Sequence, residues 1–492
     1  MNKFLRIKGM HQFYRDVFTR DIYLPEAGVM PEHVVAAILS GKLTISGEQP
    51  ETIIHAFDTG LDVKKDDALK KMLCAIAIAI ANRALDENNE GYQREFPVGL
   101  STNVIKYLES ALEYDNNINY LIAAIQILFR INEISAVLFL IEHNFSAVDK
   151  FEPVMKILLL ISLMEGDHIL ALDMIKQLLL SKGPQLAGDM TTSLMITCGL
   201  YQAGGMPENF IDFRPLNNSG YAIDYSGYTW LSKKESATKT TVLIACDKHY
   251  YFEHALPAIY SIYETNRDEL DVHLHLYNSD DEVNTSVMAL RQRLPELHIS
   301  ASVEYIAANC AMNVSYACRR FVFLSYALKN FNTPIIGVDA DVLIRKRWSL
   351  PASPASDLLL MKGDTSPFWE DVLGSFLYAE PSDVAQKYFD AVARFIDVNL
   401  KAGNYVWFLD QVALSASLDV LTEGEQTMVS RPARSSLIDL NHKNDVFCWL
   451  VTTVKNAEGP YKQYKSSLIE KYQHSPFSPN PAGERSPDRS GE

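Results

Sequence analysis

Cysteine is scarce in this sequence, and long apolar runs are absent. Its six cysteines are scattered, with no C-x-x-C and no paired spacing, which is typical of reduced thiols in a cytoplasmic protein. The longest apolar runs, 72–81 and 157–164, fall well short of the roughly 20 residues that span a bilayer. Residues 1–20 lack the continuous apolar stretch of a signal peptide. We therefore expect a cytoplasmic protein without a transmembrane segment.

Basic residues are outnumbered by acidic ones. There are 45 Lys and Arg against 61 Asp and Glu, a net charge of -16. Binding to nucleic acid needs a basic footprint, so this balance argues against nucleic acid as a partner. The sequence contains no G-x-x-x-x-G-K-[ST] and no G-x-S-x-G, which excludes P-loop proteins and α/β-hydrolases. The composition is otherwise that of a globular protein, and 492 residues predict more than one domain.

The chain changes character near residue 215. Before it, apolar residues recur at three and four positions, which predicts helices. The segments 131–137 and 164–171 resemble each other, and their alanines, Ala136 and Ala171, lie 35 positions apart. That distance is close to the period of a helix-turn-helix repeat. A tetratricopeptide-like repeat and an irregular helical bundle both fit this pattern.

After this point, strands and helices alternate. We expect strands at 241–245, 272–277, 299–306, 335–338 and 358–361, with helices at 253–265, 282–294 and 319–330. This alternation predicts an α/β domain with a mostly parallel sheet and helices on both faces. The predicted organisation is an N-terminal segment 1–50, a helical domain 51–215, a linker 216–239, an α/β domain 240–473 and a disordered tail 474–492.

Two carboxylates, Asp339 and Asp341, follow the apolar strand 335–338. In an extended chain, side chains two positions apart point to the same side, so both face one way. Clustered carboxylates beside a core repel each other unless a cation lies between them, and oxygen ligands suit Mg²⁺ or Mn²⁺. Asp247 follows the first expected strand, and such sheets bind ligands at the carboxyl ends of their strands. The alternative is a solvated pair of aspartates in a turn.

Four stretches of the region from about 240 to 421 resemble a family. They are similar to nucleotide-sugar glycosyltransferases of the GT-A fold, nearest to the glycogenin and bacterial lipopolysaccharide galactosyltransferase group. The stretches are Cys246-Asp247-Lys248-His249-Tyr250 with 258–262, Tyr316 with Arg319-Arg320-Phe321, Val338-Asp339-Ala340-Asp341-Val342-Leu343, and Phe408-Leu409-Asp410-Gln411 with 412–414.

The resemblance implies a GT-A, Rossmann-like fold and a metal-dependent transferase. It would move a sugar from a nucleotide-sugar donor, with a UDP-sugar favoured, to a macromolecular acceptor such as a protein or a surface glycan. Asp339 and Asp341 would hold Mn²⁺ or Mg²⁺ against the diphosphate. Arg320, or Arg319, would add positive charge there, because guanidinium groups suit phosphate. The helical part would bind the acceptor or a protein partner.

The same resemblance assigns the two ends of the site. Asp247 would accept a hydrogen bond from the base, while Tyr250 or the adjacent Tyr251 would stack on it. Asp410 would stabilise positive charge at the anomeric carbon, with Gln411 orienting it. The alternatives are core tyrosines and an aspartate that caps a helix starting at Gln411.

The sequence departs from the family pattern in two places. Val372-Leu373-Gly374 stands where the family has Asn-x-Gly, and no clear His-x-x-Gly-x-x-Lys segment follows late in the chain. His442, with Lys443 beside it, is the nearest candidate for a third metal ligand; the segment 455–462 is the other. His273 and His275 alternate on one strand without a third ligand, so we expect them to be structural.

Two other classes of protein remain open. The first is a helical-repeat interaction protein whose GT-A domain is inactive, which the missing asparagine and late histidine segment favour. The second is a phosphatase or phosphotransferase with Asp339 as nucleophile and Asp341 as acid. Such enzymes carry the motif on their first strand, whereas three expected strands precede it here.

Overall fold

The computed structural model describes residues 102, 105 and 108 and the stretches 118–183, 189–234, 239–349, 356–363, 366–451 and 458–473. The predicted N-terminal segment, much of the predicted helical domain and the predicted disordered tail lie outside these residues. Among the helices that the structure describes, none combines the length and apolar character needed to cross a membrane.

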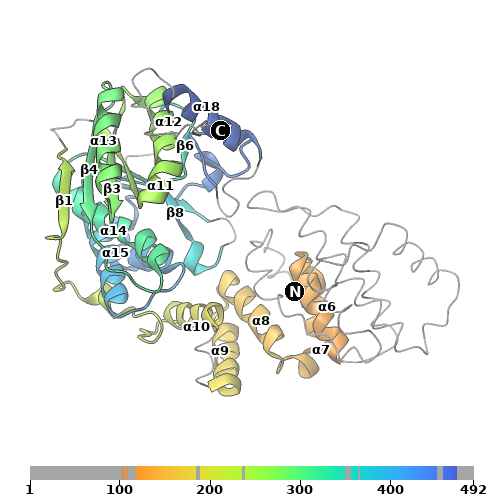
Figure 1. Ribbon diagram of the computed structural model, residues 1–492. Coiled ribbons are helices and arrows are strands. Elements are labelled where there is room, and N and C mark those ends of the chain that lie inside the picture. Colours follow the sequence, from red (N-terminus) through yellow and green to blue (C-terminus); the bar gives the residue numbers. More distant parts are fainter. Residues whose placement is uncertain are drawn as a thin grey trace, which may run out of the picture.

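Five helices form the described part of the N-terminal half (Figure 1). They are α6 (Ile118–Arg130), α7 (Ile134–Val148), α8 (Glu152–Glu165), α9 (His168–Lys182) and α10 (Met190–Gln202). Gly166 ends α8 with a φ of 68°, a left-handed conformation that glycine adopts without strain. Asp167 then caps α9 by accepting a hydrogen bond from the amide of Leu170.

The two similar sequence segments fall at equivalent places in this helical part. Residues 131–137 join α6 to α7, and residues 164–171 join α8 to α9, so each lies at the turn of a pair of packed helices. This placement agrees with helix-turn-helix units of the expected spacing. Membership of the tetratricopeptide family stays a prediction.

A mixed eight-stranded sheet forms the α/β part, in the order β1-β4-β3-β2-β5-β8-β7-β9. Its central strands β4, β3, β2 and β5 are parallel, whereas β1 and β8 run antiparallel to their neighbours. A small second sheet has the order β10-β11-β6. The strands are β1 (Tyr228–Ser232), β2 (Thr240–Cys246), β3 (Leu270–Tyr277), β4 (Ile299–Glu304), β5 (Ile335–Val338), β6 (Leu343–Ile344), β7 (Leu358–Lys362), β8 (Val372–Ala379), β9 (Val429–Ser430), β10 (Ile438–Asp439) and β11 (Cys448–Trp449).

Helices cover both faces of the large sheet. Along β2, Val242 and Ile244 belong to one hydrophobic cluster and Leu243 to another, as the alternation of side chains in a strand requires. The first cluster is completed by α12, α13 and α18, and the second by α14, α15 and α16. The helices are α11 (Lys248–Tyr250), α12 (Leu256–Asn266), α13 (Asp281–Arg293), α14 (Met312–Phe331), α15 (Asp383–Lys401), α16 (Leu409–Ala416), α17 (Glu423–Gln426) and α18 (Pro460–Gln473). The expected α/β class with helices on both faces is confirmed.

The segment 216–239, predicted as a linker, is in part a strand of the sheet. Its β1 pairs antiparallel with β4, and the ring of Tyr228 lies 5.2 Å from that of Phe323 on α14. Turn-forming residues flank this short strand, and for this reason the sequence predicts a linker here. Trp230 contributes as well, since its ring packs edge-on 5.5 Å from His273.

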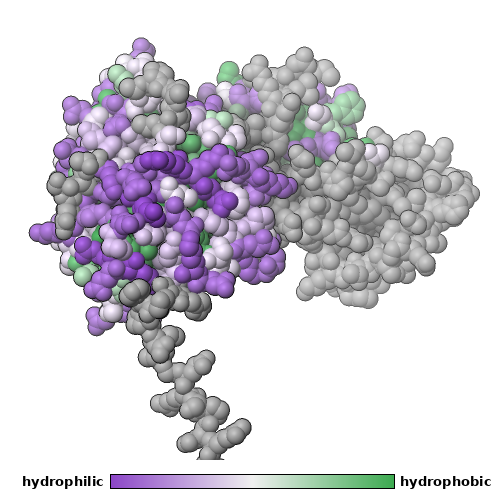
Figure 2. Space-filling view, turned by 90° about the horizontal axis from the view of Figure 1, so that it is seen from above, coloured by the Kyte–Doolittle hydropathy of each residue, from purple (hydrophilic) through white to green (hydrophobic). Residues whose placement is uncertain are grey.

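The described helical and α/β parts share one continuous core. A single cluster of buried side chains extends from Leu108 through α8 and α10 to Leu421. The ring of Tyr201 on α10 stacks 4.2 Å from Phe213, and its hydroxyl donates a 2.8 Å hydrogen bond to Asp419. Seen from above, the surface of the α/β part is mostly hydrophilic (Figure 2).

Candidate functional site

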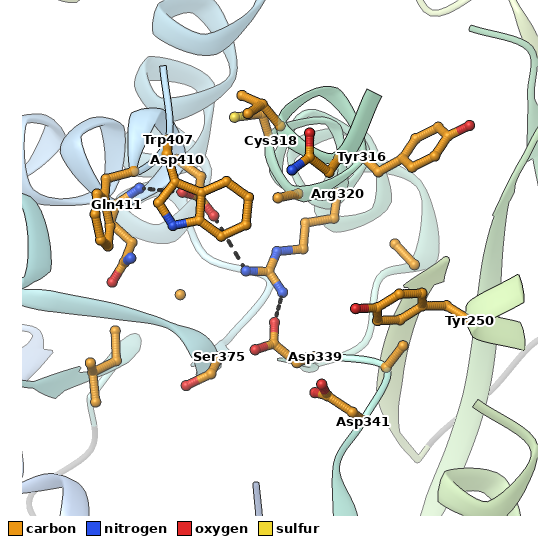
Figure 3. Close-up of a pocket in the computed structure, with 18 of the residues that line it drawn as sticks. Tyr250, Tyr316, Cys318, Arg320, Asp339, Asp341, Ser375, Trp407, Asp410 and Gln411 are labelled. Atoms are coloured by element: carbon orange, nitrogen blue, oxygen red, sulfur yellow. Dashed lines mark hydrogen bonds and ion pairs between the residues drawn. The ribbon is translucent and has the colours of Figure 1, made fainter. Parts of the chain in front are cut away.

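The order of the strands creates a crevice between the ends of β2 and β5. These strands are parallel neighbours, but β3 follows β2 on one side and β8 flanks β5 on the other. The loops that leave them therefore diverge, and ligands of open α/β sheets bind at such a switch point. A cavity of about 560 Å³ opens there (Figure 3). Its lining includes Asp247, Tyr250, Arg320, Asp339, Asp341 and Asp410.

Asp339 and Asp341 lie in the turn that directly follows β5. The amide of Asp339 donates to the carbonyl of Ser375 on β8 (3.1 Å), which fixes the start of this turn. The hydroxyl of Tyr461 on α18 donates to the carbonyl of Asp341 (2.7 Å). Asp341 is 2% exposed, whereas the side chain of Asp339 is 32% exposed. Both residues thus line the same cavity, one deep in it and one more accessible.

Arg320 on α14 joins the two acidic sides of the cavity. Its guanidinium forms an ion pair with Asp339 and lies 3.4 Å from Oδ2 of Asp410 (Figure 3). Burial lowers the pKa of Arg320, but these two carboxylates raise it on balance, so the group stays charged. Gly374 on β8 makes room for this cluster. A Cβ atom at Gly374 would lie 3.1 Å from Nη2 of Arg320 and 3.5 Å from the Asp410 carboxylate.

Arg319 is placed elsewhere, although it precedes Arg320 directly. Successive residues of an α-helix point about 100° apart, so the two arginines face different surroundings. Arg319 forms an ion pair with Glu304 at the end of β4 and lies 3.5 Å from Asp397 on α15. It does not line the cavity. Of the two arginines predicted for the diphosphate, the structure therefore brings only Arg320 to the carboxylates.

Asp410 lies in the first turn of α16, and Gln411 beside it also lines the cavity. The helix starts at Leu409, so Asp410 is not its cap; the cap is Phe408, whose φ of 76° is left-handed. Oδ1 of Asp410 accepts a 2.9 Å hydrogen bond from the amide of Gln411. Burial raises the pKa of Asp410, with Asp339 adding to the effect, although Arg320 lowers it. A carboxylate in such a water-poor place interacts strongly with any positive charge nearby.

At the opposite side of the cavity, Asp247 and Tyr250 follow β2. Asp247 accepts a 2.9 Å hydrogen bond from the amide of Tyr250 and thereby caps α11. Tyr250 lines the cavity, whereas Tyr251 is fully buried and its hydroxyl lies 3.1 Å from Ser286. Of the two tyrosines predicted for the base, Tyr250 is at the site and Tyr251 belongs to the core.

His442 is not brought to the carboxylates. Its Nε2 lies 2.8 Å from the carbonyl of Leu450, its φ is 56°, and it does not line the cavity. Its ring packs 5.1 Å from that of Tyr461, and it is the hydroxyl of Tyr461, not the imidazole, that bonds the turn of Asp341. The imidazole is therefore committed to the backbone of its own loop. No group of three or more His, Cys, Asp or Glu that could hold a metal occurs within the described ranges.

Asp339 and Asp341 nevertheless fit a hard cation. Mg²⁺ is commonly held by one or two carboxylates, and water and substrate phosphates complete its shell. The two aspartates supply such a donor set on one wall of a cavity large enough for a substrate. Arg320 competes for Asp339, so a cation here would have to share that carboxylate with the guanidinium or displace it.

Several lining residues were not singled out from the sequence for a role in the site. Ser375 lines the cavity because its strand β8 pairs with β5. Trp407 lines the cavity because it lies in the turn before α16. Cys318 lines the cavity from α14 but carries no sequence signal of its own. An aromatic residue three positions before Asp410 was the one clue available for Trp407.

Neither a protein-family model nor a curated protein matches the chain. Among solved structures, the galactosyltransferase LgtC in complex with donor and acceptor sugar analogues aligns over 48% of this chain and 98% of its own, at 12% identity and a TM-score of 0.32. The apo form of the glycosyltransferase GlyE from Streptococcus pneumoniae TIGR4 aligns over 39% of this chain and 42% of its own, at 15% identity and a TM-score of 0.24. At these scores neither likeness establishes a common fold.

Proposed function

We propose that this protein is a metal-dependent glycosyltransferase that uses a nucleotide-sugar donor. The observation that carries the proposal is the order of groups across one cavity. Tyr250 lies at one side, Arg320 with Asp339 and Asp341 in the middle, and Asp410 at the other side (Figure 3). Asp247, which accepts a hydrogen bond from the amide of Tyr250, lines the same cavity. A nucleotide sugar presents its base, its diphosphate and its sugar in the same order.

The middle group suits a diphosphate. A divalent cation held by Asp339 and Asp341 would act as a Lewis acid that neutralises charge on the departing diphosphate. Arg320 would direct its guanidinium at the same oxygens, since a planar fork with several donors matches phosphate geometry. The two carboxylates raise its pKa further, so the guanidinium stays charged beside the diphosphate. At the base end, Tyr250 would stack on the base, with Asp247 close to its edge.

Asp410 would act on the sugar. Positive charge develops at the anomeric carbon as the bond to the diphosphate breaks, and a fixed carboxylate stabilises it. The hydrogen bond from the amide of Gln411 holds the carboxylate in place, and the side chain of Gln411 is available to orient the sugar. Arg320 opposes the rise in the pKa of Asp410 that burial causes, and it also pairs with Asp339, so both ends of the site share one guanidinium.

We propose a macromolecular acceptor, either a protein or a glycan, because a small acceptor would need only the cavity. Packed helix pairs form extended surfaces that hold protein segments. The described helices present apolar side chains to solvent: Phe139 is 54% exposed, Ile169 85% and Leu180 78%. A UDP-sugar is the donor that we test first, on the strength of the motif resemblance.

A thermal-shift titration with a panel of UDP-sugars, with and without Mn²⁺, tests this proposal on the full chain. We expect wild-type protein to be stabilised only when both are present, and Asp341→Asn to lose this response while it stays folded. Asp445→Asn is the matched control, since that side chain is 78% exposed and lies outside the cavity. Stabilisation by phosphate mimics alone would favour a phosphatase, and no response at all would favour an inactive domain in an interaction protein.

A further inference from the structure

Trp407 is the tryptophan that this protein exposes. The chain has five tryptophans, and each is described by the structure. Trp369 and Trp449 are buried, Trp230 and Trp348 are half-buried, and Trp407 is 48% exposed. An indole is large enough that leaving half of it in water forgoes much favourable burial. A single exposed aromatic residue needs no explanation on an ordinary surface, but Trp407 lines the cavity of the candidate site.

A short turn with backbone hydrogen bonds on both sides of Trp407 holds it in this place. After α15, Gly403 adopts a φ of 82°, and the amide of Asn404 donates to the carbonyl of Asn399 (2.9 Å). The amide of Leu409 then donates to the carbonyl of Val406 (3.1 Å). Val406 and Leu409 are both buried, so the chain on either side of the indole is anchored in the core. The ring is thus presented on a rigid support.

The residue next to Trp407 is strained. Phe408 has a φ of 76°, and a left-handed conformation is unfavourable for a bulky side chain. Such strain persists only where the surroundings enforce it, and it is concentrated at binding and catalytic sites. Here it lets the chain turn from the exposed Trp407 directly into α16, which carries Asp410 in its first turn.

Trp407 lies on the side of the cavity away from the predicted base site. Figure 3 shows Trp407 together with Asp410 and Gln411 on one side, Tyr250 on the other, and Arg320 between them. If the donor lies along this axis, its nucleotide end is at Tyr250 and its sugar end at Asp410. The indole then lies at the sugar end of the cavity, where the molecule that receives the sugar also has to bind.

We propose that Trp407 is the stacking platform of the acceptor site, and that the group bound there is a sugar ring. The inference rests on the proposed function and narrows its acceptor to a glycan or a glycosylated molecule. A pyranose has an apolar C–H face and a polar rim. The electron-rich face of an indole attracts the C–H face, while Gln411 and Arg434, which also line the cavity, are suited to the hydroxyl groups at the rim.

Free sugars test this inference without any turnover. Wild-type protein is titrated with the methyl glycosides of glucose, galactose and N-acetylglucosamine and with lactose and maltose, followed by tryptophan fluorescence and calorimetry. Because Trp407 is the exposed tryptophan, we expect a bound sugar to change the emission. We expect Trp407→Phe to lose that signal but to bind within about threefold of wild type, and Trp407→Ala to bind about tenfold more weakly. Tyr305→Ala, which removes an aromatic ring that is 66% exposed outside the cavity, should bind normally.

Each other outcome overturns the inference. Equal sugar affinity in Trp407→Ala and wild type would show that Trp407 is not the stacking platform. Binding of unglycosylated peptides in place of sugars would contradict a sugar as the bound group. Loss of the UDP-sugar and Mn²⁺ response in Trp407→Ala would assign the indole to the donor. If wild type shows that donor response but binds no free sugar, the inference fails while the proposed function stands. If wild type shows no donor response, the proposed function fails and the acceptor role fails with it.

Discussion

Two adjacent arginines on α14 have separate surroundings, and these surroundings predict separate consequences of their loss. Arg319 bonds Glu304 and Asp397, which ties α14 to the end of β4 and to α15. Arg320 bonds Asp339 and Asp410 inside the cavity. The first set of contacts connects structural elements, whereas the second connects groups that we propose to act on the substrate.

We predict that Arg319→Gln destabilises the protein while Arg320→Gln inactivates it. Removing one partner of a buried ion pair should lower the free energy of unfolding by about 2 to 4 kcal/mol in Arg319→Gln, with donor binding retained below the melting temperature. Arg320→Gln should lower transfer about a hundredfold or more, because a charged group aimed at the leaving diphosphate is lost. Urea unfolding and turnover per folded molecule measure both effects. Similar turnover in the two variants would contradict the proposed role of Arg320 at the diphosphate.

Gly374 offers a test of spacing that leaves every polar group in place. In Gly374→Ala the new methyl group would lie 3.1 Å from Nη2 of Arg320, so we expect the guanidinium to move by a few tenths of an ångström. Small displacements in a site lower rates steeply, and we expect a loss of about tenfold to a hundredfold in turnover. The melting temperature should change little. Gly424→Ala is the control, since its Cβ atom would meet nothing within 4 Å.

From the sequence, the types of residue in the candidate site could be predicted. Which of two adjacent residues lines the cavity could not. The pair Asp339 and Asp341 is recognisable because it directly follows a buried strand. The choice between Arg319 and Arg320 depends on how α14 is rotated against the sheet, and no local pattern encodes that rotation. The position of Trp407 depends on a turn between two helices, and the sequence shows only that an aromatic residue lies three positions before Asp410.

The strands β3 and β4 are linked on one face by a row of buried polar side chains. His273 lies 2.8 Å from Ser300 and 2.9 Å from Ser302 through its two ring nitrogens. His275 lies 2.9 Å from the same Ser302 and 3.2 Å from Glu304. Every ring nitrogen of both histidines has a partner in this row. The geometry is that of structural histidines, as expected from their sequence pattern.

Because of these two buried histidines, we predict that the free energy of unfolding decreases in mild acid. Burial lowers the pKa of both from the ordinary value of 6.5, with His275 and Lys234 adding to the effect at His273. The folded state therefore favours neutral rings, while the unfolded chain binds protons near pH 6.5. Their stabilising effect is complete above that pH and decreases as the pH falls below it, by about 1.4 kcal/mol per pH unit for each proton.

Urea unfolding at a series of pH values between 7.5 and 5.5 measures this dependence. We expect His273→Gln to reduce the slope of the unfolding free energy against pH by about one proton. His143→Gln, at an exposed position on α7, should leave the slope unchanged. A slope that is the same in all three proteins would mean that the buried histidines do not determine the acid sensitivity.

At the level of elements, alternating and apolar runs identified β2, β3, β4, β5 and β7, whereas β1, β8 and the two-residue strands were not predicted. The expected strand 335–338 coincides with β5, and the expected helix 282–294 with α13 within one residue at each end. The helix α14 begins seven positions earlier than expected, at Met312, because polar residues at its start resemble a loop. β1 was missed, since its pairing with β4 depends on a partner distant in the sequence.

The whole molecule has no clean boundary at residue 215. Residues after that point still contact α15: the hydroxyl of Tyr221 donates to Asp397 (2.5 Å). Before it, the amide of Asp212 donates to Asn399 (2.8 Å), whose side chain donates back to the carbonyl of Asp212 (2.9 Å). Together with β1, these contacts assign the segment between α10 and β2 to the α/β part.

We predict that the place of truncation decides whether the α/β part folds. A chain that starts at Ser232 loses most of β1 and the contacts on α15, so we expect it to be insoluble. A chain that starts at Asp189 keeps α10, which Tyr201 anchors to Asp419, and we expect it to be soluble and to bind UDP-sugar with Mn²⁺. Expression, gel filtration and thermal shift compare the two. A soluble, donor-binding chain from Ser232 would show that these contacts are dispensable.

The chain that starts at Asp189 also distinguishes binding of the acceptor at the cavity from binding of the acceptor on the helices. Trp407 is proposed to bind a sugar ring at the cavity, whereas the exposed apolar side chains of α7 and α9 are proposed to bind a macromolecule. The chain that starts at Asp189 keeps the first and lacks the second. It should therefore hydrolyse donor and transfer to small glycosides at rates close to those of the full chain. Transfer to a macromolecular acceptor should fall steeply, because the helices no longer raise its concentration at the cavity. Equal loss of all three activities would instead give the helices a purely structural role.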